Sequence, residues 1–183
     1  MRLYLIRHPQ PDVVEGFCYG RSDLPLRGPW SAAEIAASLP PGATVISSPL
    51  RRCAEFARAL SGNVQLDERI AELDFGAWEM LAWDDIDTVQ LDAWAANPLG
   101  FDGHGGESVQ QMRERVRAAL ADLGGHDCVW VTHAGVMKLV LAELLTLPQD
   151  EWLALRFDYA ELIVLQQEPG TPAGSRWSRQ SRQ

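Results

Sequence analysis

The feature that most constrains this fold is a regular alternation of short apolar runs with helix-like segments. The first run, residues 2–7, has four apolar residues between two arginines and is typical of a buried strand. Further strands are predicted over residues 44–47, 64–66, 128–132 and 162–165. Helices are predicted over residues 30–39, from Ser48-Pro49 to Leu60, from Gly105-Gly106-Glu107-Ser108 to about Leu123, and from Val136 to Leu147. This order predicts a three-layer α/β/α fold with a mostly parallel central sheet.

Two stretches do not follow this alternation. Residues 8–28 are rich in glycine and proline and are predicted to form a long loop. Residues 77–104 have broken helical periodicity, and their fold cannot be derived from the pattern; we expect them to form a lid at the mouth of the site. We therefore expect one domain over residues 1–167, followed by a flexible tail over 168–183.

Composition excludes several classes of function. A net charge of −9 argues against general binding to nucleic acids or anionic membranes, and an anionic ligand would need a local positive pocket. No run approaches the roughly 20 apolar residues of a membrane span, and the first run is too short for a signal peptide. The three cysteines, widely spaced, fit neither a disulfide framework nor a zinc motif. These features predict a soluble, cytoplasmic protein with buried or idle thiols.

Polar and charged residues follow three of the predicted strands. They are Arg7-His8, the segment Ser47-Ser48-Pro49-Leu50-Arg51-Arg52, and Thr132-His133-Ala134-Gly135. Ligands of parallel α/β sheets bind beyond the carboxyl ends of the strands, and a helix start adds free backbone N–H groups. Two histidines and at least two arginines are therefore predicted to converge on a phosphate pocket.

These residue types suit phosphoryl transfer without a metal or cofactor. A neutral imidazole can attack phosphorus and form a phosphohistidine that water hydrolyses. Arginines and a second histidine would stabilise the negative charge of the transferring group. A carboxylic acid must protonate the leaving alkoxide, and Glu72 is our candidate. Glu68, Asp67 and Asp74 are the alternatives, as part of a solvated acidic face.

Five segments, in this order, resemble the histidine phosphatase superfamily, which is also called phosphoglycerate mutase-like. They are Leu5-Ile6-Arg7-His8, residues 47–52, Glu72-Leu73-Asp74-Phe75-Gly76-Ala77-Trp78-Glu79, residues 105–108, and Val131-Thr132-His133-Ala134-Gly135-Val136. The resemblance covers roughly residues 1–165. It implies a phosphoglycerate mutase-like fold, with His8 as the phosphorylated histidine and Glu72 as the proton donor. It also implies a phosphate pocket of Arg7, Arg51 and His133.

Two departures from the family pattern concern the loop after His8. The family usually has glycine where this chain has Pro9, which lacks an N–H group. The family often has an asparagine further on, and none lies between His8 and Arg27. Arg21 is our candidate for a replacement phosphate contact.

Several residues near these motifs have simpler interpretations. Arg51 and Arg52 are adjacent, so one of them is expected to face solvent, and the family pattern favours Arg51 for the pocket. Glu107 is interpreted as a cap of the following helix. His104 and His126 are expected to be exposed. Trp78, Trp83, Trp94 and Trp152 are expected to pack in the core or the lid.

The short chain favours hydrolysis over a mutase reaction, since the mutases that it resembles carry extra segments. Residues 20–26 and 148–158 are similar to α-ribazole phosphatases, which implies α-ribazole-5′-phosphate as substrate and a place in cobalamin biosynthesis. A broad-specificity phosphatase, a phosphoglycerate mutase and a non-catalytic phospho-ligand module remain alternatives. The predicted partner is a small phosphorylated metabolite, and a homodimer stays open.

Overall fold

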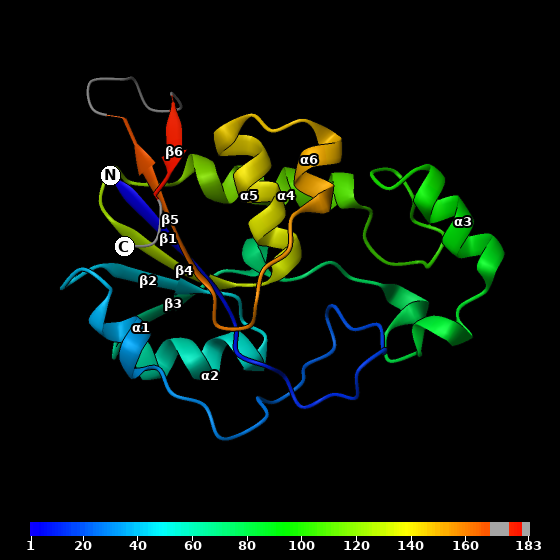
Figure 1. The fold of residues 1–183 in the computed structure, drawn as a ribbon, viewed down its shortest axis with the longest axis horizontal. Helices are drawn as coiled ribbons and strands as arrows, with labels where there is room; N and C mark the ends of the chain where they lie inside the picture. The colour runs from blue at the N-terminus through cyan, green and yellow to red at the C-terminus, as the bar shows by residue number, and fades with distance from the viewer. Residues whose placement is uncertain (169–175, 181–183) are drawn as a thin grey trace.

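The centre of the molecule is a six-stranded sheet, which the computed structural model shows in the strand order β3-β2-β4-β1-β5-β6 (Figure 1). Residues 1–168 and 176–180 are described. The strands are β1 (Arg2–Arg7), β2 (Thr44–Ser47), β3 (Val64–Leu66), β4 (Cys128–Thr132), β5 (Leu162–Gln167) and β6 (Trp177–Arg179). Neighbouring pairs among β3, β2, β4 and β1 are parallel, while β5 pairs antiparallel with β1 and β6 with β5. The predicted mostly parallel sheet is confirmed.

Helices cover both faces of this sheet (Figure 1). They are α1 (Ala33–Ala37), α2 (Arg51–Leu60), α3 (Thr88–Ala96), α4 (Val109–Ala121), α5 (Ala134–Leu145) and α6 (Gln149–Ala154). Three short 3₁₀ helices are η1 (Glu68–Ile70), η2 (Gly76–Trp78) and η3 (Trp83–Asp85). Within the described residues, no helix is long and apolar enough to cross a membrane.

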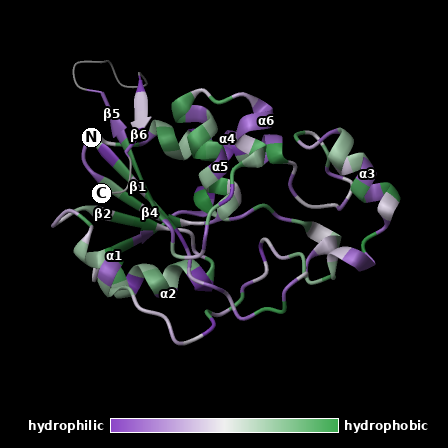
Figure 2. Cartoon of the chain, viewed as in Figure 1, coloured by the Kyte–Doolittle hydropathy of each residue, from purple (hydrophilic) through white to green (hydrophobic). Residues whose placement is uncertain are grey.

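Alternate residues of β1 explain why both faces must be covered. Leu3 and Leu5 belong to the core shared with α4 and α5, whereas Tyr4 and Ile6 belong to the core shared with α2. Successive side chains of a strand point to opposite faces, so an apolar run buries both of them. Figure 2 shows the hydrophobic strands between the two helical layers.

The ends of two predicted helices differ from the structure. The helix expected over 30–39 is only α1, because the Ser31 hydroxyl accepts a hydrogen bond from the Ala33 N–H group (3.3 Å) before the first turn. The helix expected from Ser48-Pro49 begins at Arg51, whose N–H group donates to an Asp23 carboxylate oxygen (2.6 Å). In both cases a side chain satisfies backbone donors at the helix start.

The capping role predicted for Glu107 is wrong. The N-cap of α4 is Ser108, which forms a reciprocal capping box with Gln111. Glu107 instead binds the Arg115 guanidinium, with its Oε1 atom 2.6 Å from Nε and its Oε2 atom 2.7 Å from Nη2.

The segment after β5 also differs from the prediction. Residues 177–179 form β6 and pair with Leu165–Gln167 of β5, where we expected a flexible tail. Residues 169–175 and 181–183 of the predicted tail lie outside the described residues.

Candidate active site

The predicted loops do meet at the carboxyl ends of the strands. β1 and β4 lie side by side with Arg7 paired to Thr132, and the His8 N–H group donates to the Thr132 carbonyl (3.0 Å). The next residues of the two strands, His8 and His133, therefore lie together, with ring centroids 5.2 Å apart. Both rings are buried, with 2% and 0% of each residue exposed.

The His8 ring is held in one tautomer by its neighbour in the chain. His8 Nδ1 lies 2.6 Å from the Pro9 carbonyl oxygen, which can only accept, so Nδ1 carries the hydrogen. Nε2 then has a free lone pair, which accepts a hydrogen bond from Arg52 Nε (3.3 Å). Proline at position 9 therefore leaves this contact intact, because the contact uses the Pro9 carbonyl group and needs no N–H donor.

Arg52, and not Arg51, reaches His8, so the prediction that placed Arg51 in the pocket is wrong. Arg52 is fully buried, and its guanidinium also donates to the Gly20 carbonyl (2.6 Å) and the Ser22 carbonyl (2.8 Å). The Arg51 side chain is 55% exposed and pairs with Glu55 on the outer face of α2. Adjacent residues of an α-helix point about 100° apart, so only one of the two can face inward.

Arg7 lies against the C-terminal segment of the domain. Its Nη1 atom donates to the Phe157 carbonyl (2.6 Å), and its guanidinium lies 4.0 Å from the centre of the Tyr159 ring. Its Nε–H group is buried and has no acceptor among the described residues. A buried guanidinium donor without an acceptor is costly unless a ligand satisfies it, as a phosphate oxygen would.

Both histidines are neutral near pH 7. Burial, followed by the positive charge of Arg52, lowers the pKa of His8 well below its usual value, and it does the same to the pKa of His133. His133 Nε2 lies 2.8 Å from the Ser48 hydroxyl and 3.4 Å from the Cys53 sulfur. A neutral His8 keeps the nucleophilic lone pair that attack on phosphorus needs.

Glu72 lies at the start of α5, the helix whose N-cap is His133. Its carboxylate accepts hydrogen bonds from the N–H groups of Leu73 (3.0 Å) and Gly135 (3.1 Å). A Cβ atom on Gly135 would lie 2.3 Å from Glu72 Oε1, so this approach requires glycine. The carboxylate of the predicted proton donor thus binds the N–H group two residues after the second histidine.

Arg21 does not reach His8 through its side chain. Its guanidinium pairs with Glu68 (3.1 Å) and lines a separate pocket with Asp23 and Asp74. The loop that contains it reaches Arg52 through the Gly20 and Ser22 carbonyls instead.

Glu79, which no sequence motif marks as a site residue, anchors this loop. The Glu79 carboxylate accepts hydrogen bonds from the N–H groups of Gly20, Arg21, Ser22 and Phe75 and from the Ser22 hydroxyl. Burial alone would raise the pKa of Glu79, but these hydrogen bonds outweigh it and hold the pKa below its usual value. Glu79 thus fixes the N–H groups of a loop whose carbonyls hold Arg52 against His8.

We expect Glu79→Gln to lower kcat/KM for p-nitrophenyl phosphate by roughly tenfold or more, because an amide in this position opposes the loop N–H groups. A displaced Arg52 would also let the His8 pKa rise, which moves the acid limb of the kcat/KM profile to higher pH. Steady-state kinetics from pH 4 to pH 9 measure both effects. Glu68→Gln, in a side chain that is 72% exposed, is the control. A lower rate with an unmoved acid limb would mean that Glu79 stabilises the fold only.

Two tyrosines at the site also escaped the sequence analysis. The hydroxyl groups of Tyr19 and Tyr159 lie 2.8 Å apart, and the Arg52 guanidinium lies 5.5 Å from the Tyr19 ring centre. The Tyr159 and His8 ring centroids are 5.8 Å apart. No local signal marks either tyrosine, since they meet only through the packing of two distant loops.

The segment 77–104 contains an aromatic cluster. Trp83 and Trp94 stack with centroids 5.9 Å apart, and Trp78 packs edge-on against both. His104 is buried beside Trp78 with 2% exposure, so the prediction that it is exposed is wrong, whereas His126 is exposed as expected. His104 Nδ1 accepts the Gly106 N–H group (3.0 Å), which explains a histidine inside this cluster. The packing predictions for the four tryptophans are confirmed.

The cysteines and the residue types that commonly bind metals were also considered as sites in the described residues. Cys18, Cys53 and Cys128 are all buried and free, as predicted. Over residues 1–168 and 176–180, no three or more His, Cys, Asp or Glu side chains are grouped so that they could hold a metal ion.

Comparison with known proteins decides the family. Residues 3–180 match the model of the histidine phosphatase superfamily (branch 1). The chain belongs to this superfamily. Histidine phosphatases are phosphoric monoester hydrolases and mutases, and the chain is an enzyme of the phosphatase type.

Three relatives illustrate the range of this histidine phosphatase's neighbours. It is 30% identical over 175 residues to the adenosylcobalamin/α-ribazole phosphatase of Escherichia coli, with 86% of each chain covered. It is 31% identical over 195 residues to a probable phosphoglycerate mutase, GpmB, of Klebsiella pneumoniae, with 95% of this chain and 89% of the relative covered. The structure of mycobacterial glucosyl-3-phosphoglycerate phosphatase with VO₃ superposes with a TM-score of 0.82 at 29% identity, covering 99% and 98% of the two chains.

Proposed function

We propose that this histidine phosphatase hydrolyses phosphomonoesters through a phosphohistidine at His8. The observation that supports this most strongly is the His8 tautomer: the Pro9 carbonyl holds the hydrogen on Nδ1 and leaves the lone pair on Nε2. Nε2 attacks phosphorus as the bond to the ester oxygen breaks. Glu72 protonates the leaving oxygen, and then, as a base, it removes a proton from the water that attacks the phosphohistidine.

Arg7, Arg52 and His133 would carry the negative charge of the transferring phosphoryl group. Arg52 and His133 surround His8, and Arg7 adds a buried Nε–H donor that no described residue accepts. Donors placed in advance on the equatorial oxygens are the main source of rate acceleration in phosphoryl transfer. Arg21, from its position, supports the loop that holds Arg52 and is not proposed as a phosphate ligand.

Hydrolysis of p-nitrophenyl phosphate in the presence of excess EDTA tests this function. Because protein side chains (His8, the pocket donors and Glu72) perform every proposed step, we expect the rate with EDTA to equal the rate without it. Released p-nitrophenol, followed by absorbance, measures the rate. An inactive protein, or one whose activity EDTA removes and a divalent metal restores, would contradict the proposal.

The substrate is a separate proposal. Residues 20–26 and 148–158 and the E. coli relative support α-ribazole-5′-phosphate and a role in cobalamin biosynthesis, while the other two relatives carry names of phosphoglycerate enzymes. A panel of α-ribazole-5′-phosphate, 3-phosphoglycerate and sugar phosphates would rank these classes. If α-ribazole-5′-phosphate is not preferred, the link to cobalamin biosynthesis is dropped.

Residues 77–104 are proposed as the lid over the leaving group, since Trp94, Ala95 and Pro98 line a pocket together with Arg7. A cytoplasmic location and a homodimer also remain proposals, which fractionation and light scattering would test.

A further inference from the structure

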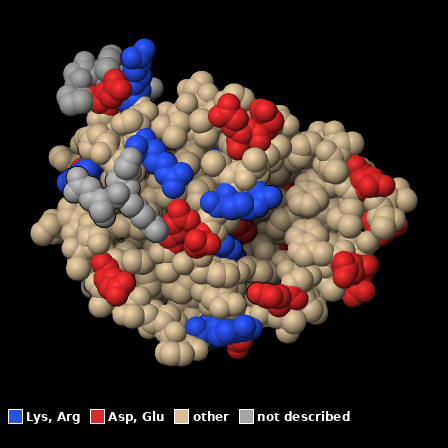
Figure 3. Space-filling view, viewed as in Figure 1, with Lys and Arg blue, Asp and Glu red and all other residues tan. Residues whose placement is uncertain are grey.

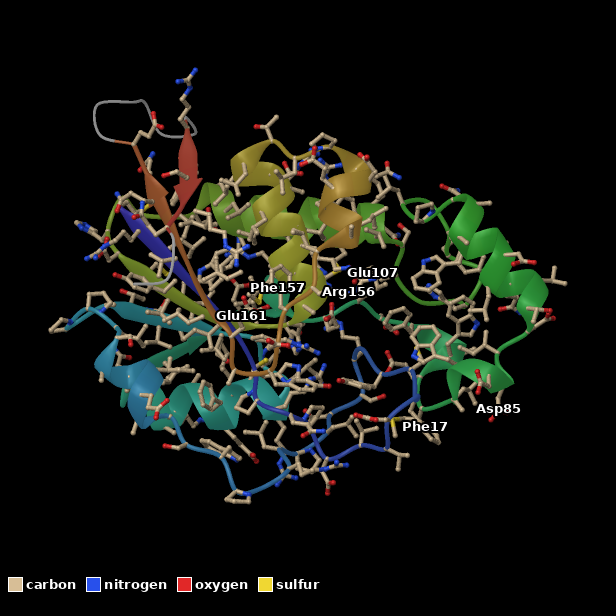
Figure 4. All side chains as sticks on the ribbon, in the orientation of Figure 1. Phe17, Asp85, Glu107, Arg156, Phe157 and Glu161 are labelled. Atoms are coloured by element: carbon tan, nitrogen blue, oxygen red, sulfur yellow. The ribbon has the colours of Figure 1, made fainter. Side chains whose placement is uncertain are left out.

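A pocket of about 500 Å³ shares Arg7 with the phosphate site. Its lining includes Arg7 and Ala134, the neighbours of the two site histidines in the chain, and Trp94 of α3. Lys138 and Arg156 also line it. Figure 4 labels Arg156 next to Phe157 on the segment that leaves α6, and Figure 3 shows basic side chains on the same central part of the surface.

Lys138 and Arg156 share one backbone acceptor. Lys138 Nζ donates to the Leu153 carbonyl (2.7 Å), and Arg156 Nη1 donates to the same oxygen (3.2 Å). Burial, and then the charge of Arg156, lower the pKa of Lys138, while the charge of Glu72 acts in the opposite direction and only partly offsets them. Two cations on one carbonyl repel each other, and this repulsion is relieved when an anion binds between them.

No ion pair neutralises these two cations in the described residues, although the charge of Glu72 acts on Lys138 through space. Within the described part of the chain, neither Lys138 nor Arg156 forms an ion pair, and no Asp or Glu lines the pocket. The whole chain has 25 acidic residues against 16 Lys and Arg residues, so a pocket wall with three cations and no acid departs from its general charge. Arg7 is assigned to the reacting phosphate. Lys138 and Arg156 are therefore available to bind a second negative group.

The spacing suits a small substrate. Lys138 lies four residues after Ala134 on α5, which places it about 6 Å further along the same face of the helix. A second anion held there would therefore lie about one helical turn beyond the reacting phosphate. The separation matches a leaving alcohol of only a few carbon atoms.

We infer that Lys138 and Arg156 form a subsite for a second anionic group, a carboxylate or a phosphate, on the leaving alcohol of the substrate. The inference rests on the proposed phosphatase function and narrows its substrate class. It ranks doubly anionic esters above α-ribazole-5′-phosphate, whose leaving nucleoside carries no anion.

Matched pairs of esters test the subsite. 3-Phosphoglycerate and glycerol 3-phosphate differ only in a carboxylate, and fructose 1,6-bisphosphate and fructose 6-phosphate differ in a second phosphate. Phosphate release gives kcat/KM for each ester, with α-ribazole-5′-phosphate in the same series. We expect the doubly anionic member of at least one pair to be preferred by roughly tenfold, the size of a charge-assisted hydrogen bond. The pair with the larger preference identifies the second group as a carboxylate or a phosphate.

Lys138→Met and Arg156→Met should each remove most of that preference. Arg58→Met removes a positive charge from the exposed face of α2 and should leave the preference unchanged. Equal kcat/KM values within both pairs, or a preference that survives both substitutions, would overturn the subsite.

A failure of the phosphatase function is distinguishable from these results, because the wild type would then hydrolyse no ester, p-nitrophenyl phosphate included. Calorimetric binding of the same pairs to the wild type would then decide the subsite without turnover. Tighter binding of the doubly anionic member, lost in Lys138→Met, would support it, and equal binding would overturn it.

Discussion

His8→Ala is expected to lower kcat for p-nitrophenyl phosphate by at least about 10⁴-fold, since loss of a catalytic nucleophile removes the covalent route altogether. The residual rate would come from binding and from the remaining arginine donors. Steady-state assays at high enzyme concentration measure both rates.

His126→Ala provides the matched control, because this histidine is exposed and precedes β4, at the opposite end of that strand from His133. It should keep the wild-type rate. Thermal unfolding checks that His8→Ala, in which the Arg52 Nε–H group loses its acceptor, still folds. A folded His8→Ala protein that retains a tenth of the wild-type kcat would exclude His8 as the nucleophile.

The second large loss of activity is expected for substitution of Arg52 and not of the adjacent Arg51. Arg52→Ala should lower kcat by about 10²–10³-fold, the usual loss when one donor to the transition state is removed. Arg51→Ala should stay within about twofold of the wild type, because an exposed ion pair such as Arg51–Glu55 contributes little. The same kinetic assay measures both variants.

Arg52→Lys sharpens this comparison. It keeps the positive charge but loses the planar guanidinium that binds the Gly20 and Ser22 carbonyls while its Nε–H group faces His8. We expect it to remain impaired by at least about tenfold. If Arg51→Ala lowered kcat more than Arg52→Ala, Arg51 would be the pocket residue, as the family pattern predicted. The assignment of Arg52 from the geometry of α2 would then be wrong.

The periodicity of α2 distinguishes these two arginines. Arg52 is four residues before Phe56, which is fully buried, so the two share the inner face of α2. Arg51 is four residues before Glu55 and shares the outer, polar face. A sequence motif does not show which of two adjacent residues faces the interior. The 3.6-residue period of a helix does, because it places them on different faces.

The strands and the loops that follow them were predictable because each is a local pattern. An apolar run followed by Arg7-His8 or by Thr132-His133 needs only the rule that strand ends meet at one edge of a parallel sheet. Glu79, Tyr19 and Tyr159 could not be placed in this way. The hydrogen bond of Glu79 to Ser22 spans 57 residues of the chain and that between Tyr19 and Tyr159 spans 140, and no periodicity records such contacts.

Contacts between distant segments also explain why the burial of His104 and the strand in the predicted tail were not foreseen. His104 is buried by aromatic rings from several short segments, and β6 forms only by pairing with β5. In both places tertiary contacts, rather than local propensity, decide the structure.

Trapping the phosphoenzyme tests most directly whether His8 is the nucleophile. The protein is mixed with a phosphomonoester, quenched within milliseconds, kept at alkaline pH to preserve a phosphoramidate, and digested for mass spectrometry. We expect one added phosphoryl group on the peptide that contains His8, absent in His8→Ala and present in His126→Ala. A phosphoryl group on a different residue of an active enzyme would contradict this expectation.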